Sequence, residues 1–398
     1  MGGTGLVTRS AAVESLLDRR RELLAGRDAE SVTPDVVAGR TAASAVTAPA
    51  SVPSADFATM DGFAFASGDE YPRSVVARVD PAGDPPALGV GEAVRVATGA
   101  PLPARADAVL PREDATVSDA GLTGPSLSPG TNLVRAGTTA TEGEALFEAG
   151  DRLAPRHAAL LRDVGVDEVA VHRRLSVGIL ATGTEIHEGT QPDRDSDVLA
   201  NLVREWGHAP TLLGAVPDEE AAVYGAIERA ADAHDLVLTS GGTGGSEGDH
   251  VGTALADHDR LFAGVALRPG RPTTAATVGG TLVCGLPGKP LAAHTAATLL
   301  VRPALTGETR LPTVTVPATS DVDLPSPDRE YAVPVAFSDG QAEPVGHEDS
   351  DRPLYGTRFA PGRVAATTAI SLADGFVLTT EPFESGDSVE VVPYEVVE

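Results

Sequence analysis

The spacing of apolar residues predicts a helix near the start of the chain and short strands after it. Residues 11–25 repeat apolar side chains at helical spacing between Val13 and Leu24, as an amphipathic helix does. Gly26 follows this pattern directly, and glycine commonly ends helices. Residues 51–129 change to short runs such as VVARV and AVRVA, separated by turn-forming segments such as DPAGDPP. This second stretch is predicted to be a small all-β module.

Helical spacing returns beyond this module. Residues 130–172 contain APRHAALLRDVG at helical spacing, followed by EVAVH, which alternates like a strand. We infer that residues 51–129 are inserted into a mixed N-terminal domain, which residues 1–50 and 130–172 form together.

The rest of the chain predicts two further domains. Residues 173–310 alternate strand-like runs, among them SVGILAT, LVLTS and TLVCG, with helical runs. Such alternation predicts a parallel, doubly wound α/β sheet. Residues 311–398 carry alternating strands such as TVTVP and GFVLTT without a long helical period, which predicts a C-terminal β-barrel or sandwich. The chain is therefore predicted to be an α/β multidomain protein.

The charge balance argues against some classes of partner. The 398 residues hold 57 Asp and Glu against 30 Lys and Arg, a net charge of -27, which would repel nucleic acid and anionic membranes. We therefore expect no nucleic-acid partner. Lys289 is the only lysine, and the acidic residues are spread along the chain, as in a protein kept soluble in high salt.

Cysteine use and the N-terminus indicate a cytoplasmic protein. Cys284 is the only cysteine, so no disulfide forms within the chain, and no Cys/His spacing matches a structural zinc site. The start MGGTGLVTRS lacks the apolar core of a signal peptide, and Leu6 stands where a myristoylation motif needs Ser or Thr. Because no run reaches transmembrane length, we expect no membrane partner.

Three loops with glycine follow predicted strands of the α/β domain, in ILATGTE, LTSGGTGGSEGD and VCGLPGKP. Ligands of open parallel sheets bind beyond the carboxyl ends of the strands. The second loop is the most informative, because its glycines let backbone amides approach an anion and a predicted helix follows, which suits phosphate. A purely structural glycine turn is the alternative. The residues of this loop are Ser240, Gly241, Gly242, Thr243, Gly244 and Gly245.

Two acidic residues stand beside these loops. Asp249 closely follows the second loop, where bound phosphate would repel it unless Mg²⁺ intervened; it is either a metal ligand or a helix N-cap. Glu185 follows the first loop and either accepts a hydrogen bond from a ring nitrogen or a ribose hydroxyl, or simply starts a helix.

Basic residues near the third loop suit an oxyanion. Arg268 and Arg271 flank a rigid Pro-Gly turn in VALRPGRP, and paired guanidinium groups bind tetrahedral oxyanions well. Two surface arginines that offset the acidic excess are the alternative. The segment CGLPGKP lacks the spacing of a Walker-type loop, so Pro287, Gly288 and Lys289 are predicted to form a tight turn facing an anion. Lys289 itself either contacts phosphate or lies on an exposed turn.

Two turns of the β module add polar candidates. TMDGF contains Asp61 and ATGAP contains Thr98, and both turns are able to present these side chains to a cleft. Taken alone, the two segments would be interpreted as hairpin loops.

Taken in order, these segments resemble the molybdopterin molybdenumtransferase family, the MoeA-type proteins related to the C-terminal domain of gephyrin. The matching runs cover most of residues 50–310, and ADGFVLTTEPFESGDSVEV is similar to the family's terminal β domain. The ordered set is far more specific than any single motif. The runs are VPSADFATMDGFAFAS, AVRVATGAPLPARADAVLPRED, GTNLVRAG, LATGTEI, TSGGTGGSEGD, LRPGRP and GLPGKP.

The resemblance implies an elongated four-domain subunit, with the mixed N-terminal domain involved in forming a homodimer. The β module of one chain would face the molybdopterin-binding α/β domain of the other, so that two subunits share the active site. The implied reaction inserts molybdate into adenylylated molybdopterin, with Mg²⁺-dependent cleavage of the pyrophosphate link and release of AMP. Other proteins of molybdenum cofactor biosynthesis are the implied partners.

The resemblance also implies a role for each candidate residue. Asp61 and Asp249 are implied to bind the metal or assist hydrolysis, and Arg268 with Arg271 to bind molybdate. The physical chemistry agrees, because the reaction needs positive charge around molybdate and a cation beside the departing phosphate. The implied contacts to the pterin nucleotide are Thr98, Glu185, Ser240, Gly241, Gly242, Thr243, Gly244, Pro287, Gly288 and Lys289.

Four positions depart from the family's pattern. Thr139 stands where the family commonly has an acidic residue, and Gly244 stands where it usually has a small hydroxyl residue. Asp195 and Lys289 each stand at a position where the family often has Asn. The first departure removes one candidate carboxylate. Two alternatives therefore stand beside the transferase: a non-catalytic paralogue that carries or senses molybdopterin or molybdate, and a scaffold that acts through its C-terminal β domain. Retention of Asp61, Asp249 and both arginines argues against the scaffold.

Overall fold

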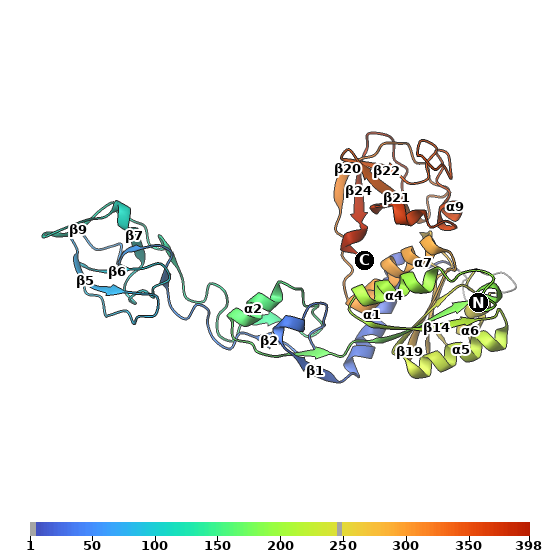
Figure 1. The fold of residues 1–398 in the computed structure, drawn as a ribbon, viewed down its shortest axis with the longest axis horizontal. Coiled ribbons are helices and arrows are strands. Elements are labelled where there is room, and N and C mark those ends of the chain that lie inside the picture. Colours follow the sequence, from blue (N-terminus) through green and yellow to red (C-terminus); the bar gives the residue numbers. More distant parts are fainter. Residues whose placement is uncertain (1–4, 245–248) are drawn as a thin grey trace. The chain divides into compact units, whose positions relative to one another are not determined.

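The computed structural model describes residues 5–244 and 249–398 of a chain that forms two compact units. The larger unit contains residues 1–30, 39–41 and 172–398, and the smaller contains residues 31–38 and 42–171. Each unit is built around its own sheets (Figure 1). No helix within the described ranges combines the length and the apolar character needed to cross a membrane.

The smaller unit contains a four-stranded sheet. Its strand order is β5-β6-β4-β7, and only the β5–β6 pair is parallel. The predicted strands VVARV and AVRVA are confirmed as β5 and β6. Side chains of β4 alternate between two small cores, with Ala64 in one and Phe63 and Phe65 in the other. The four strands are β4 (Gly62–Phe65), β5 (Ser74–Val79), β6 (Glu92–Val96) and β7 (Ala108–Pro111).

The helical prediction for residues 130–172 is right only in its later part. A helix, α2 (His157–Asp163), and a strand, β12 (Val169–His172), follow as expected. Before them the chain forms short strands because glycines at positive φ, such as Gly137 and Gly143, impose turns. The remaining short strands that involve this unit are β1 (Ala29–Val32), β2 (Val46–Thr47), β3 (Phe57–Ala58), β8 (Thr116–Ser118), β9 (Gly121–Thr123), β10 (Leu133–Val134) and β11 (Ala145–Phe147).

The larger unit contains a six-stranded sheet in the order β14-β13-β15-β19-β18-β16. Its first four strands are parallel, as predicted, but β18 and β16 are antiparallel and were not predicted. The reversal occurs at Gly279 and Gly280, which both have positive φ and form a two-residue hairpin turn. The strands are β13 (Ser176–Thr182), β14 (Ala209–Val216), β15 (Leu236–Ser240), β16 (Asp259–Ala263), β18 (Thr274–Val278) and β19 (Thr281–Leu286).

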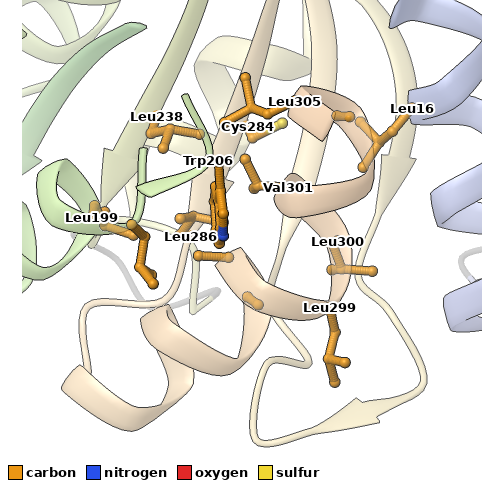
Figure 2. Packing of buried hydrophobic residues seen from close by; sticks show 14 of the residues in the cluster. Leu16, Leu199, Trp206, Leu238, Cys284, Leu286, Leu299, Leu300, Val301 and Leu305 are labelled. Atoms are coloured by element: carbon orange, nitrogen blue, oxygen red, sulfur yellow. The ribbon is translucent and has the colours of Figure 1, made fainter. Parts of the chain in front are cut away.

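Helices cover both faces of this sheet. The predicted first helix is confirmed as α1, which packs with α4 and the α7–α8 segment over one face, while α5 and α6 cover the other (Figure 1). Figure 2 shows Trp206 packed among leucines of the first layer, and its indole nitrogen donates to the Val397 carbonyl at 3.0 Å. The helices are α1 (Arg9–Ala25), α3 (Thr184–His187), α4 (Asp195–Glu205), α5 (Glu220–Ala233), α6 (His250–Ala256), α7 (Pro290–Ala296), a π-helical turn (Ala297–Val301) and α8 (Arg302–Thr306).

A second sheet of the larger unit is made mainly by the C-terminal residues. Its order is β17-β21-β23-β24-β20, with β22 paired to β21. The first strand comes from the LRPGRP segment, so this sheet fixes the backbone of Arg268 through its parallel pairing with Tyr331. The elements are β17 (Leu267–Arg268), β20 (Val314–Pro317), β21 (Glu330–Ser338), β22 (Gln341–Pro344), α9 (Pro361–Ala365), β23 (Gly375–Thr379) and β24 (Ser388–Pro393).

Candidate functional site

A cleft of about 790 Å³ opens where three neighbouring parallel strands end. Its lining includes the segments that follow β13, β15 and β19, together with the Arg268–Pro272 turn. The position agrees with the rule that open α/β sheets bind ligands beyond the carboxyl ends of their strands. The volume is in the usual range for a small-molecule site.

The cleft brings together every predicted site residue of the larger unit that the structure describes. Gly245, the last glycine of the predicted phosphate loop, lies outside the described residues. The predicted residues that line the cleft are Glu185, Ser240, Gly241, Gly242, Thr243, Gly244, Asp249, Arg268, Arg271, Pro287, Gly288 and Lys289.

Close backbone packing explains part of the glycine content of this cleft. Gly241 has φ +94°, and a Cβ there would lie 2.7 Å from the Thr182 carbonyl oxygen. A Cβ on Gly288 would lie 2.9 Å from the Gly241 Cα. The Gly241 amide also donates to the Leu286 carbonyl at 3.1 Å. These glycines are therefore required by contact between the three strand ends, whether or not a ligand binds.

Carboxylates lie beside these loops. Asp249 occupies the N-cap position of α6, and its Oδ2 lies 3.1 Å from the point where a Gly244 Cβ would stand. The Glu185 carboxylate lies similarly over Gly183. Asp218 also lines the cleft and was missed from the sequence, although it follows β14 by two residues. The strand-end rule, applied to this neighbouring strand, would have found it.

The carboxylates of the cleft are suited to hold Mg²⁺ only together with the phosphates of a substrate. Within residues 5–244 and 249–398, no group of three or more His, Cys, Asp or Glu side chains is arranged to hold a metal ion. Mg²⁺ usually binds one or two protein carboxylates and takes its other ligands from substrate phosphates and water. Asp249 beside a loop suited to phosphate meets that requirement.

Arg268 supplies positive charge at the cleft. It is half-buried, and its Nε is a buried donor with no hydrogen-bond partner among the described residues. Burial lowers the pKa of Arg268, and the neighbouring charges of Arg329 and Arg271 lower it further. An oxyanion beside this guanidinium group would accept from the unsatisfied donor and offset the repulsion among the arginines.

Asp195 also lines the cleft. The sequence analysis noted it only as a position that departs from the family's pattern, without a role in the site. Its side chain is 7% exposed, Ser240 Oγ donates to its Oδ2 at 2.6 Å, and its Oδ1 is buried without a partner among the described residues. Burial raises the pKa of Asp195, the Ser240 hydrogen bond lowers it, and the Asp193 charge raises it again. The net effect favours the neutral acid.

We expect Asp195→Asn to make the protein more stable at neutral pH. Because the folded state raises the pKa of Asp195 above its usual 3.8, the unfolded chain releases this proton first, and stability falls as pH rises through the window above 3.8. Asparagine removes that loss and keeps an oxygen acceptor for Ser240. Urea unfolding at weakly acidic and neutral pH measures the difference, and a variant that is less stable at both pH values would contradict the burial argument.

Asp61 and Thr98 form a pair of their own in the smaller unit. The Thr98 amide and hydroxyl both donate to Asp61 Oδ1, at 2.8 and 3.0 Å. These two hydrogen bonds, the backbone one first, lower the pKa of Asp61, and the charges of Arg112 and Arg95 add to them. The two predicted turns of the β module thus meet, with Asp61 ionised and exposed at neutral pH.

Two family models match most of the chain. The family model described as "MoeA N-terminal region (domain I and II)" matches residues 8–165, and the model described as "Probable molybdopterin binding domain" matches residues 178–307. The second match contains the three strand-end loops of the cleft.

Curated relatives and solved structures cover more of the chain. It is 33% identical to a molybdopterin molybdenumtransferase of Haemophilus influenzae over 67% of this chain and 70% of the relative. It is 31% identical to the Bacillus subtilis molybdopterin molybdenumtransferase over 87% of this chain and 85% of that one. A molybdopterin biosynthesis MoeA protein from Pyrococcus horikoshii matches in structure with a TM-score of 0.66 and 27% identity, over 98% of this chain and 99% of the other. The chain therefore belongs to the molybdopterin molybdenumtransferase family.

Proposed function

We propose that this protein inserts molybdate into adenylylated molybdopterin and releases AMP, which completes molybdenum cofactor. The observation that carries the proposal is one cleft whose lining includes a glycine loop, the unsatisfied Arg268 donor and several carboxylates, at the ends of three parallel strands. Family membership supports the same reaction, because the relatives carry the corresponding name.

The candidate residues have different roles in the proposed reaction. The loop from Ser240 to Gly244 and the turn at Gly288 bind the phosphates of the adenylylated pterin. Arg268 and Arg271 hold molybdate near the dithiolene sulfurs, where guanidinium groups stabilise the negative charge of the oxyanion. Thr98, Glu185, Pro287 and Lys289 are proposed as further contacts to the pterin nucleotide.

Acidic residues complete the proposed mechanism. Mg²⁺, when bound, would offset the charge that develops on the phosphates as water cleaves the pyrophosphate link. Asp249 is proposed to hold this ion, and Asp61 to serve as a second metal ligand or to assist hydrolysis. The lowered pKa of Asp61 supports this role, because it keeps the carboxylate ionised at neutral pH.

The proposed working form is a cytoplasmic homodimer. Asp61 and Thr98 belong to the smaller unit, whereas the cleft belongs to the larger. We propose that the β module of one subunit completes the cleft of its partner, so that the active site is shared. The net charge of -27 supports adaptation to high salt, in which the assay is best run.

The direct test measures AMP release from purified protein in high salt, given adenylylated molybdopterin, Mg²⁺ and molybdate. We expect AMP to appear only when molybdate is present, in proportion to the molybdenum cofactor formed. Normal binding of the pterin nucleotide without molybdate-dependent AMP would show instead a non-catalytic carrier or sensor. Absence of both binding and AMP release would favour a scaffold.

A further inference from the structure

The C-terminal β domain, residues 311–398, contributes to the lining of the cleft. Pro361, Gly362 and Ala365 of helix α9 are among the lining residues, although the sequence pointed to no site residue beyond Lys289. These residues belong to the same compact unit as the three strand-end loops. The terminal domain is therefore part of the cleft itself.

A shared hydrophobic core fixes α9 beside the third strand-end loop. Leu291 and Ala292, in the first turn of α7, are buried in one cluster with Val364 and Ala365 of α9. Helix α7 begins directly after Lys289, the last residue of that loop. Because protein interiors are close-packed, this core holds the C-terminal domain and the loop in a fixed relation.

Backbone hydrogen bonds attach the same domain to the segment that carries Arg268. Strand β17 pairs with β21 in parallel, and Arg268 lies opposite Tyr331. The Glu330 amide also donates to the Ala266 carbonyl at 3.0 Å. Arg329 comes directly before Glu330, so its backbone lies next to the strand of Arg268.

Arg329 has no acidic partner at this pairing. The neighbouring carboxylate of Glu330 is bound by Arg9, whose Nε and Nη2 donate to its two oxygens at 2.9 and 3.1 Å. Within residues 5–244 and 249–398, no ion pair joins Arg329, Arg268 or Arg271 to a carboxylate. This local excess of positive charge contrasts with the net charge of -27 of the whole chain.

The charge of Arg329 acts on the guanidinium group of Arg268. Burial lowers the pKa of Arg268 most, and of the neighbouring cations Arg329 has the larger effect and Arg271 the smaller. Arg329 therefore acts on Arg268 at least as strongly as Arg271, which itself lines the cleft. An anion bound at Arg268 would experience the same positive charge as attraction.

We propose that Arg329 is a third cation of the oxyanion site, supplied by the C-terminal domain, and that its charge raises the affinity of the cleft for molybdate. This inference rests on the molybdate site of the proposed function and gives the C-terminal domain a role in that site. Arg329 does not line the cleft. It therefore acts through its charge on the anion held by Arg268, and not by direct contact with substrate.

A charge series at position 329 tests this role in the full chain. Equilibrium dialysis against molybdate, with bound molybdenum measured by mass spectrometry, gives the Kd of each variant. Arg329→Gln should raise the Kd about fivefold, the size typical of a charge interaction partly exposed to solvent. Arg329→Lys should remain close to the unaltered protein, and Arg329→Glu should bind more weakly than Arg329→Gln. A merely structural side chain would not follow this order of charge.

Arg352→Gln is the matched control, because Arg352 is exposed in the same domain and does not line the cleft. Its Kd should be unchanged. An unchanged Kd in Arg329→Gln, while Arg268→Ala binds molybdate more weakly, would overturn the role of Arg329, as would a loss that Arg329→Lys does not restore. If the unaltered protein bound no molybdate, the oxyanion site itself would be wrong. Binding that follows the charge order without molybdate-dependent AMP release would contradict the proposed reaction and leave this inference in place.

Discussion

Asp249→Ala should lower the rate of molybdate-dependent AMP release by at least about 100-fold, the loss typical when a group that stabilises transition-state charge is removed. Asp249 lies at the end of the phosphate-loop candidate, and its carboxylate is the proposed protein ligand of Mg²⁺. Initial rates measured over a range of Mg²⁺ concentrations will check this result. The apparent affinity for Mg²⁺ should fall together with the rate.

A matched variant separates this effect from damage to helix α6. Asp257 lies at the other end of the same helix and is exposed, so Asp257→Ala should retain normal AMP release. A melting curve of Asp249→Ala checks that the variant remains folded. If Asp249→Ala turned over normally, the proposed metal site would be wrong, whatever its stability.

Arg268→Ala should act mainly on molybdate. The half-buried guanidinium group has an unsatisfied Nε and lies near two other arginines, so its removal takes away a charged donor from the cleft. Hydrogen bonds to charged groups contribute about 1.5–3 kcal/mol, which corresponds to a rise of about 10- to 100-fold in the KM for molybdate. Steady-state rates over a molybdate series measure that KM, and the KM for the pterin nucleotide should change less.

Arg260→Ala is the control for total charge, because Arg260 is exposed on β16 and does not line the cleft. It should leave both KM values unchanged. Arg268→Lys keeps the charge but loses the planar fork, so its KM for molybdate should lie between those of Arg268→Ala and the unaltered protein. An unchanged molybdate KM in Arg268→Ala would remove this residue from the oxyanion site.

The position of the cleft could be predicted from the sequence, because short local patterns mark the strands and the loops that follow them. Three of the parallel strands, β13, β15 and β19, end in loops that contain glycine, and their neighbouring positions in the sheet bring these loops to one edge. The antiparallel pairing of β18 with β19 escaped prediction because it depends on the Gly279–Gly280 turn, and β16 in turn pairs with β18. Helical periodicity was wrongly predicted for the residues between 130 and α2, because the spacing of apolar residues does not reveal the turns that glycines at positive φ impose.

Burial and charge partners could not be predicted in the same way. Asp195 appeared in the sequence only as a substitution, and the structure alone reveals its buried oxygen and its bond to Ser240. The contact of Asp61 with Thr98 joins two turns far apart in sequence, which no periodicity specifies. The resemblance to a family pointed to both turns together, whereas each alone was only a hairpin loop.

In the proposed reaction, one cleft of the larger unit binds both the nucleotide phosphate and molybdate. A crystal structure of the full chain with AMP and molybdate, with anomalous data collected at the molybdenum edge, tests it most directly. We predict a molybdenum peak beside the Arg268 guanidinium group and the AMP phosphate against residues 241–244. Molybdenum bound elsewhere, with this cleft empty while AMP occupies another surface, would contradict the account.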